Sequence, residues 1–217
     1  MTVGLRRPLL SLVTDRRRYA PGRMLPTIAA AAGAGVDLVQ VREPDLNDGA
    51  LLALVREVVA ATCPPTCVVV NDRADIALAG GAAGVHLRAD SVPAASVRGV
   101  VPDGFLIGRS VHSVREAEAA AEEGACDYLI FGTVFPSTSK PAGHPVAGLP
   151  GLAEVAAAVG ARVPVLAIGG ISERDAEAIA GTGAAGVAAI GLFASAPDLQ
   201  ALVRSLRRPF DTPFPVV

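Results

Sequence analysis

Short apolar runs recur along the chain. Each is followed by a polar or glycine-containing turn and then by an alanine- and leucine-rich segment with helical periodicity. The runs are short and bounded by turn residues, which is typical of buried strands. They cover residues 9–13, 38–41, 67–70, 84–87, 106–108, 128–131, 165–168 and 187–190. The helical segments cover approximately residues 25–33, 48–61, 74–80, 93–100, 113–124, 149–160, 172–181 and 197–207. The pattern therefore predicts eight strands that alternate with eight helices.

Strict alternation of strand and helix predicts parallel strands, and eight such units close into a (β/α)₈ TIM barrel. An open doubly wound sheet is the alternative, but it normally carries a G-x-G-x-x-G turn after its first strand. Here that turn consists of Thr14, Asp15 and Arg16. No linker or composition break divides the chain, so we predict a single TIM-barrel domain over residues 1–217. Residues 209–217, with two Phe and three Pro, are expected to form a C-terminal tail.

Composition narrows the class of protein. Of the 217 residues, 51% are hydrophobic and 18% charged, which is enough apolar material for a large core. The formal net charge of −2 argues against bulk binding of nucleic acid, which needs a basic footprint. The three cysteines lack the spacing of metal ligands, which favours a reducing, cytoplasmic location. No apolar stretch approaches the roughly 20 residues of a membrane span, so we expect no membrane association.

Polar side chains collect at the ends of the predicted strands, where barrel enzymes place their working groups. They come from the second to the sixth units and include Gln40, Arg42, Glu43, Asn71, Asp72, His86, Arg88, Asp90, Arg109, Ser110, His112 and Thr133. Because the carboxyl ends of parallel strands meet at one mouth, these residues predict one shared site.

The last three strand ends point to an anion. Gly169 and Gly170 in the segment AIGGI would let backbone N–H groups approach a phosphate, as would Ile190 at the end of the eighth strand and Gly191 after it. The long loop over residues 132–145 offers hydroxyls and a lysine but no acid, and its length favours a lid. Its candidate ligands for an oxyanion are Ser137, Thr138, Ser139 and Lys140.

Among the histidines, His112 is the candidate for proton transfer, because imidazole titrates near neutral pH and the residue follows the fifth strand. His86 lies within the fourth strand and is expected to pack or to form hydrogen bonds, and His144 is expected to be solvated. The basic run of residues 16–18 is interpreted as a solvated surface by default, with anion steering as the alternative.

In these same segments the chain resembles the thiamine phosphate synthase/TenI family. The resemblance runs nearly from end to end. Its motifs are LVTDR at 12–16, VQVRE at 39–43, VNDRAD at 70–75, GVHL at 84–87, IGRSVHS at 107–113, FGTVFPSTSK at 131–140, AIGGI at 167–171 and GVAAIGLF at 186–193. The resemblance implies a (β/α)₈ barrel that binds a thiazole phosphate at the ends of strands 7 and 8. It also implies a homodimer.

The family has two activities. The synthase joins a pyrimidine diphosphate to a thiazole phosphate with Mg²⁺ and releases diphosphate. The TenI branch is a thiazole tautomerase, which shifts a proton to aromatise a thiazole carboxylate phosphate without a cofactor. Two departures bear on the choice. Pro44 replaces the lysine of the synthase pattern Q-x-R-x-K. Ser91 replaces the aspartate of the pattern H-L-G-Q-x-D, which supplies a second carboxylate for the metal in synthases, and Arg88 adds a cation in the same segment.

These departures remove a cation and a carboxylate from one subsite, so we expect a TenI-like thiazole tautomerase, an isomerase. His112 would transfer the proton, and Arg42, Ser110 or Lys140 would hold the substrate carboxylate. The remaining expected substrate-binding residues are Gln40, Glu43, Asn71, Thr133, Ser137, Thr138, Ser139, Gly169, Gly170, Ile190 and Gly191. One alternative is a thiamine phosphate synthase, a transferase, with Mg²⁺ on Asp72. A second is a barrel that binds thiazole or thiamine phosphates without catalysis. A sugar-phosphate isomerase is conceivable on fold alone and has no motif support.

Overall fold

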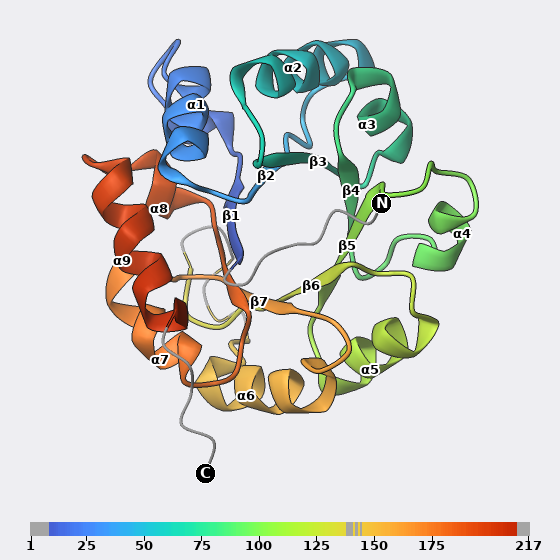
Figure 1. Cartoon of the computed structure of the whole chain (residues 1–217), viewed down its shortest axis with the longest axis vertical. Helices are drawn as coiled ribbons and strands as arrows, with labels where there is room; N and C mark the ends of the chain where they lie inside the picture. The colour runs from blue at the N-terminus through green and yellow to red at the C-terminus, as the bar shows by residue number, and fades with distance from the viewer. Residues whose placement is uncertain (1–8, 138–140, 142, 144, 212–217) are drawn as a thin grey trace.

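The computed structural model describes residues 9–137, 141, 143 and 145–211. Eight parallel strands form a closed barrel in which each strand pairs with the next along the chain and β8 pairs with β1 (Figure 1). The strands are β1 (Leu9–Val13), β2 (Leu38–Val41), β3 (Cys67–Asn71), β4 (Gly84–Leu87), β5 (Leu106–Val111), β6 (Tyr128–Phe131), β7 (Val165–Ile168) and β8 (Gly186–Ala189). The predicted (β/α)₈ TIM barrel is confirmed.

The helices surround the barrel, as the outer ring in Figure 1 shows. They are α1 (Met24–Ala34), α2 (Asp48–Ala61), α3 (Ala74–Gly80), α4 (Ala94–Arg98), α5 (Val114–Glu123), α6 (Gly148–Val159), α7 (Ala176–Ala180), α8 (Gly191–Ala194) and α9 (Leu199–Asp211). Two short 3₁₀ helices, η1 (Arg16–Arg18) and η2 (Glu173–Asp175), follow β1 and β7. Helix α5 is capped at its start, since Ser113 Oγ accepts the backbone N–H of Glu116 at 3.2 Å.

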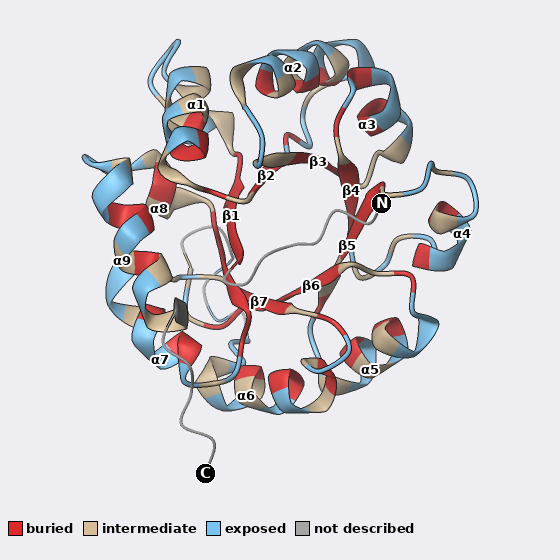
Figure 2. Cartoon of the chain, viewed as in Figure 1, coloured by how far each residue is buried: buried red, intermediate tan, exposed pale blue. Residues whose placement is uncertain are grey.

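The strands are buried on both faces, which explains why they read as continuous apolar runs (Figure 2). Side chains that point inward, such as Leu9, Leu38 and Tyr128, form a small core inside the barrel. Side chains that point outward, such as Leu10 and Val39, pack against the buried stripes of the helices in a much larger core. Because successive residues alternate between these two cores, the last inward residue of each strand faces the mouth of the barrel.

Several predicted boundaries change. Strand β5 continues to Val111, so Ser110 is part of a strand rather than of a loop. The segment predicted as a helix over 172–181 is divided into η2 and α7, and the short helix α8 follows β8 without having been predicted. Residues 209–211 of the predicted tail form the end of α9, and residues 212–217 lie outside the described residues.

Two arginine–aspartate pairs tie helices to the starts of strands, at the end of the barrel opposite the mouth. Arg207 of α9 lies 2.5 Å from the carboxylate of Asp37, and Arg98 of α4 lies 2.6 Å from that of Asp127. Each carboxylate also accepts a backbone N–H from a neighbouring strand at 2.7 Å. These pairs hold the strand starts in place, so this end of the barrel contributes stability.

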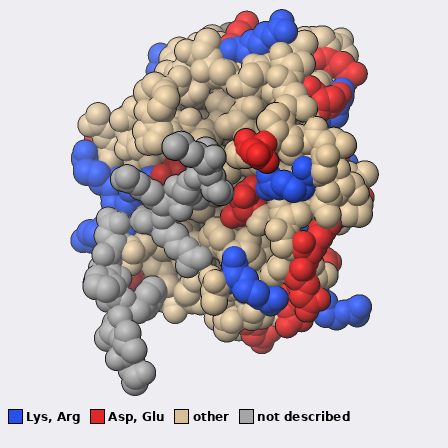
Figure 3. Space-filling model, turned by 45° about the vertical axis from the view of Figure 1, so that its right-hand side comes forward, with Lys and Arg blue, Asp and Glu red and all other residues tan. Residues whose placement is uncertain are grey.

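Across the described part of the chain, no helix has the length and apolar character needed to cross a bilayer. On the face shown in Figure 3, lysine and arginine side chains alternate with aspartate and glutamate, and the acidic ones form the longer run. The expectations that the chain binds neither nucleic acid nor membrane stay predictions.

Candidate active site

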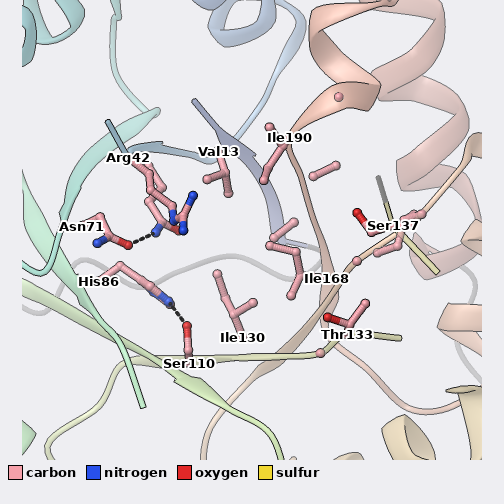
Figure 4. Close-up of a pocket in the computed structure, with 18 of the residues that line it drawn as sticks. Val13, Arg42, Asn71, His86, Ser110, Ile130, Thr133, Ser137, Ile168 and Ile190 are labelled. Carbon is pink, nitrogen blue, oxygen red and sulfur yellow. Dashed lines mark hydrogen bonds between the residues drawn. The ribbon is translucent and has the colours of Figure 1, made fainter. Parts of the chain in front are cut away.

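A cavity of about 840 Å³ opens at the carboxyl ends of the strands. Its volume lies in the range of small-molecule sites. Most of the predicted site residues line it, so the strand ends share one pocket. These are Gln40, Arg42, Asn71, Ser110, His112, Thr133, Ser137, Gly169, Gly170, Ile190 and Gly191. Figure 4 shows how several of them face one another.

The cavity has two unlike sides with an apolar floor between them. Arg42, Asn71, His86 and Ser110 lie on one side and Thr133 and Ser137 on the other (Figure 4). The floor consists of Val13, Ile130, Ile168 and Ile190, which are the last inward residues of β1, β6 and β7 and the residue after β8. We call the side formed by β2 to β5 the polar half, and the side formed by the segments after β6, β7, β8 and β1 the glycine half.

The polar half is built from inward-facing residues near the ends of adjacent strands. Gln40 Nε2 donates to Asn71 Oδ1 at 3.0 Å, which joins β2 to β3. His86 Nε2 lies 2.9 Å from Ser110 Oγ, which joins β4 to β5. Arg42 lines the cavity next to this row, and its guanidinium forms no ion pair with the described residues. A cation without a counter-ion at a row of amides and a hydroxyl favours an anionic ligand.

His86 is an uncharged member of this row. Desolvation, helped by the charge of Arg42, lowers its pKa to about 3. Only 1% of its surface is exposed. Its expected role in packing and hydrogen bonding agrees with this environment.

His112 follows the end of β5 and lines the cavity with an exposed side chain. Its Nδ1 lies 2.6 Å from the carbonyl oxygen of Gly132. Because a carbonyl only accepts, Nδ1 carries a proton, and Nε2 of the neutral ring is an acceptor. The backbone N–H of His112 donates to Glu116 at 2.7 Å, which holds the residue at the start of α5.

The glycine half is built from backbone. Gly169 and Gly170 have φ values of +105° and +63°, which side chains rarely allow. A Cβ at Gly170 would lie 2.7 Å from the carbonyl oxygen of Phe135. The N–H of Phe135 donates to the carbonyl of Gly169 at 3.0 Å. The segment after β6 and the one after β7 are therefore packed together, and the glycines make this approach possible.

The short helix α8 begins at Gly191, directly after β8. A short extra helix at this place is a recurrent phosphate-binding feature of (β/α)₈ barrels, because its first N–H groups have no partner within the helix.

Of the three arginines after β1, only Arg18 lines the cavity. Its Nη1 lies 3.3 Å from the position that a Cβ would take at Gly191. Arg18 Nε donates to Asp15 at 3.3 Å, which orients the guanidinium. Arg16 instead pairs with Asp45 at 2.6 Å, and Arg17, whose side chain is 65% exposed, pairs with Asp15 at 3.0 Å. The default interpretation as a solvated surface missed Arg18, although its place after a strand end was the available signal.

Some predicted residues lie elsewhere. Glu43 is 4% exposed and does not line the cavity, because its carboxylate accepts the backbone N–H of Arg16 at 3.0 and 3.2 Å. It holds the segment after β1 against β2. Thr138, Ser139 and Lys140 lie outside the described residues, as does His144.

Asp72 lies beside the cavity rather than in its lining. It has φ +59° and follows directly after β3. Its carboxylate accepts the hydroxyl of Ser91 and lies 3.8 Å from Arg88 Nη1. Within the described ranges, no three His, Cys, Asp or Glu side chains are grouped so that they could hold a metal ion on their own.

Comparison with known proteins connects this geometry to a family. A family model described as thiamine monophosphate synthase matches residues 10–193. The chain is 37% identical over 201 residues to the thiamine-phosphate synthase of Roseiflexus castenholzii, with 92% of this chain and 87% of that protein covered. It is 42% identical over 182 residues to the thiamine-phosphate synthase of Anaeromyxobacter dehalogenans, with 84% and 81% covered.

A solved structure gives the same result. The thiamine phosphate pyrophosphorylase from Pyrococcus furiosus superposes with a TM-score of 0.79 at 30% identity, over 93% of this chain and 95% of that one.

These comparisons overturn the expected tautomerase. The relatives at 37% and 42% identity are named thiamine-phosphate synthases, which are transferases, and not isomerases. The expectation gave too much weight to Pro44 and Ser91. In the structure Ser91 places a hydroxyl against Asp72, and Arg88 lies within 3.8 Å of the same carboxylate, so the subsite is altered but not dismantled. The proton transfer assigned to His112 belonged to the tautomerase and is withdrawn with it.

Proposed function

Because the chain belongs to the thiamine monophosphate synthase family, we propose that it is a thiamine-phosphate synthase. In this reaction a pyrimidine carrying a methylene diphosphate is joined to a thiazole phosphate. The bond from the methylene carbon to the diphosphate oxygen breaks, a bond from that carbon to the thiazole ring forms, and diphosphate leaves.

The observation that carries the proposal is the pairing of two anion-binding regions in one cavity. The polar half has Arg42, which forms no ion pair in the described part of the chain, and the glycine half has Arg18 beside the start of α8. A cavity of about 840 Å³ has room for two small substrates. Two phosphorylated substrates that must meet need this arrangement, whereas a reaction on one phosphate ester needs only one of the regions.

We assign the diphosphate to the polar half. Arg42 would hold its charge, with Gln40 and Asn71 fixed to each other beside it by their 3.0 Å hydrogen bond. Holding the leaving group in place lowers the entropic cost of reaching the transition state, and the cation stabilises the charge that develops on the diphosphate. The apolar floor would exclude water from the reacting carbon, which protects it from hydrolysis.

The residues next to Asp72 fit the Mg²⁺ that the resemblance implies. Mg²⁺ is commonly held by one or two carboxylates and completed by substrate phosphates and water. Asp72 supplies one carboxylate, with the Ser91 hydroxyl against it. Asp90 is engaged by Arg88, 2.5 Å away. When bound, Mg²⁺ would supply charge neutralisation for the diphosphate; Asp72 and Ser91 would hold it.

We assign the thiazole phosphate to the glycine half. The N–H groups at Gly170 and at the start of α8, with Arg18 beside them, are the donors that would hold the phosphate. Ser137 and Thr133 line the same side with hydroxyls. Placing the phosphate here directs the thiazole ring over the apolar floor and toward the polar half.

The test is direct. Purified protein with pyrimidine diphosphate, thiazole phosphate and Mg²⁺ should form thiamine phosphate and release one equivalent of diphosphate, followed by ³¹P NMR. Chelation of the metal should stop turnover while thiazole phosphate still binds. If thiazole phosphate binds but no product forms at any Mg²⁺ concentration, the proposal is wrong and the barrel only binds its ligand.

We also propose a cytoplasmic location, which the three free thiols at Cys63, Cys67 and Cys126 support. The homodimer stays a prediction, and the molar mass from size-exclusion chromatography with light scattering would test it.

A further inference from the structure

Three residues lie side by side at one level of the barrel. His86 on β4 pairs with Gly108 on β5, and Gly108 pairs with Tyr128 on β6. The rings of His86 and Tyr128 meet across the glycine, with their centroids 5.5 Å apart and their planes inclined by 29°. Tyr128 Oη lies 3.2 Å from His86 Nδ1. Ser110, two residues further along β5, lies on the same inward face and nearer the mouth.

Gly108 makes this contact possible. A Cβ there would lie 2.6 Å from His86 Nδ1 and closer still to the Tyr128 ring. A glycine inside a strand often marks such a close approach. Because Gly108 has no side chain, the buried Tyr128 can reach the buried His86 across the middle of β5.

The buried tyrosine fixes the direction of the hydrogen bonds. Tyr128 has no exposed surface, and burial raises the pKa of its hydroxyl, so it keeps its proton. In the described part of the chain, His86 Nδ1 is the acceptor within its reach. A buried hydroxyl proton without an acceptor is costly, so Tyr128 donates and Nδ1 accepts.

The direction of the next hydrogen bond, from His86 to Ser110, follows from this one. A neutral imidazole that accepts at Nδ1 carries its proton at Nε2. The Nε2–H therefore donates to Ser110 Oγ over the 2.9 Å contact. Ser110 Oγ uses one of its two lone pairs to accept this hydrogen bond, while its own hydroxyl proton has no partner among the described residues. That proton is left to point into the cavity.

We propose that Tyr128 and His86 are positioning residues that orient the Ser110 hydroxyl and leave its proton available for donation to the substrate. The substrate atom that accepts this proton must carry a lone pair, as a phosphoryl oxygen or an unprotonated ring nitrogen does. The role of Ser110 toward substrate rests on the proposed function. The tautomer of His86 does not depend on the proposed function, so an experiment can contradict either claim without the other.

The tautomer is tested in the ligand-free wild-type protein by ¹⁵N NMR of the imidazoles. The chain has three histidines, so His112→Ala and His144→Ala leave the His86 signals assigned by elimination. We expect a protonated-type nitrogen at Nε2 and an unprotonated-type nitrogen at Nδ1. The opposite pattern, or a doubly protonated ring, overturns the proposal whether or not the protein is a synthase.

The link to Ser110 is tested with Tyr128→Phe, which removes one hydroxyl and keeps the ring. We expect the His86 tautomer to become mixed and kcat/KM to fall by up to about tenfold, the effect of one hydrogen bond. In a Ser110→Ala background, Tyr128→Phe should cause no further fall. If the two losses multiply, Tyr128 does not act through Ser110 and the proposal is wrong.

Tyr19→Phe is the matched control. Tyr19 is the other tyrosine of the chain, and its buried hydroxyl has no hydrogen-bond partner in the described residues. Removal of the Tyr19 hydroxyl should leave the His86 tautomer unchanged.

Binding of inorganic diphosphate to Ser110→Ala then identifies the substrate atom that Ser110 contacts: weaker binding indicates a phosphoryl oxygen. Unchanged diphosphate binding with a higher KM for the pyrimidine substrate indicates the ring nitrogen, and no change in either contradicts the proposed donor.

Discussion

The two halves of the cavity offer an anion different kinds of hydrogen-bond donor, side chains in one half and mainly backbone N–H groups in the other. In the proposed function, the polar half would recognise its ligand with side chains on rigid strands: Gln40 and Asn71 bonded to each other, His86 and Ser110 bonded likewise, and Arg42 beside them. The glycine half would use backbone N–H groups at loop and helix starts, with Arg18 as its charged side chain. We expect a side-chain substitution to weaken the polar half by degrees. The glycine half should fail abruptly when its backbone cannot take its conformation.

Gly170→Ala should have the largest effect. The residue has φ +63°, and a Cβ would lie 2.7 Å from the carbonyl of Phe135. Strain and overpacking together should lower the free energy of unfolding by about 2 to 5 kcal/mol, measured by urea denaturation. Binding of thiazole phosphate should be lost, while binding of diphosphate is largely kept.

Gly33→Ala is the control for this substitution. Gly33 lies within α1, and a Cβ there would meet nothing within 4 Å. This change should raise the free energy of unfolding by about 0.5 to 1 kcal/mol. Equal losses of diphosphate and thiazole phosphate binding in Gly170→Ala would show that the two halves are not separable.

Arg42→Gln should come next. Losing a charge-assisted hydrogen bond to the diphosphate costs about 1.5 to 3 kcal/mol, so KM for the pyrimidine diphosphate should rise by roughly ten- to a hundredfold. KM for thiazole phosphate should change less than about threefold. Arg115→Gln, at an exposed position of α5, should leave both constants unchanged. A parallel rise in both KM values would place Arg42 outside the polar half.

Arg18→Gln should raise the dissociation constant of thiazole phosphate by about tenfold, measured by calorimetry. It should also erase most of the preference for the phosphorylated thiazole over its free alcohol. Arg17→Gln is matched, because Arg17 precedes it in the chain, pairs with the same Asp15 and points outward. If both variants behave alike, general attraction rather than contact explains the effect.

Pro44→Lys and Ser91→Asp should have the smallest effects, and in the opposite direction. Each restores a charge that the synthase pattern carries next to the polar half. We expect Pro44→Lys to lower KM for the diphosphate by a few-fold, and Ser91→Asp to lower the Mg²⁺ concentration for half-maximal rate, with each effect near 1 kcal/mol or less. If neither KM nor the required Mg²⁺ concentration falls, the polar half does not need the lysine or the aspartate of the synthase pattern.

The sequence predicted most of the polar half and the barrel itself, for a physical reason. Strand periodicity and position at a strand end determine where Gln40, Asn71 and Ser110 point. It did not reveal that Glu43 turns away to bind the backbone of Arg16, because that depends on a contact 27 residues away. Arg18 was missed for a similar reason: three adjacent arginines look alike until η1 directs one of them to Gly191. The glycines at 169 and 170 were found, but as a phosphate cradle, and their packing against Phe135 was not foreseen.

The same packing has a consequence for how this barrel can change. Because a carbonyl of the segment after β6 fills the space above Gly170, the segments after β6 and β7 cannot be exchanged one at a time. A new substrate specificity, whether reached by mutation in nature or by grafting in the laboratory, would have to bring both segments from the same parent. The segments after β2, β3 and β4 form no hydrogen bond with that pair among the described residues, so they can be exchanged without it, whereas His112 after β5 contacts the carbonyl of Gly132.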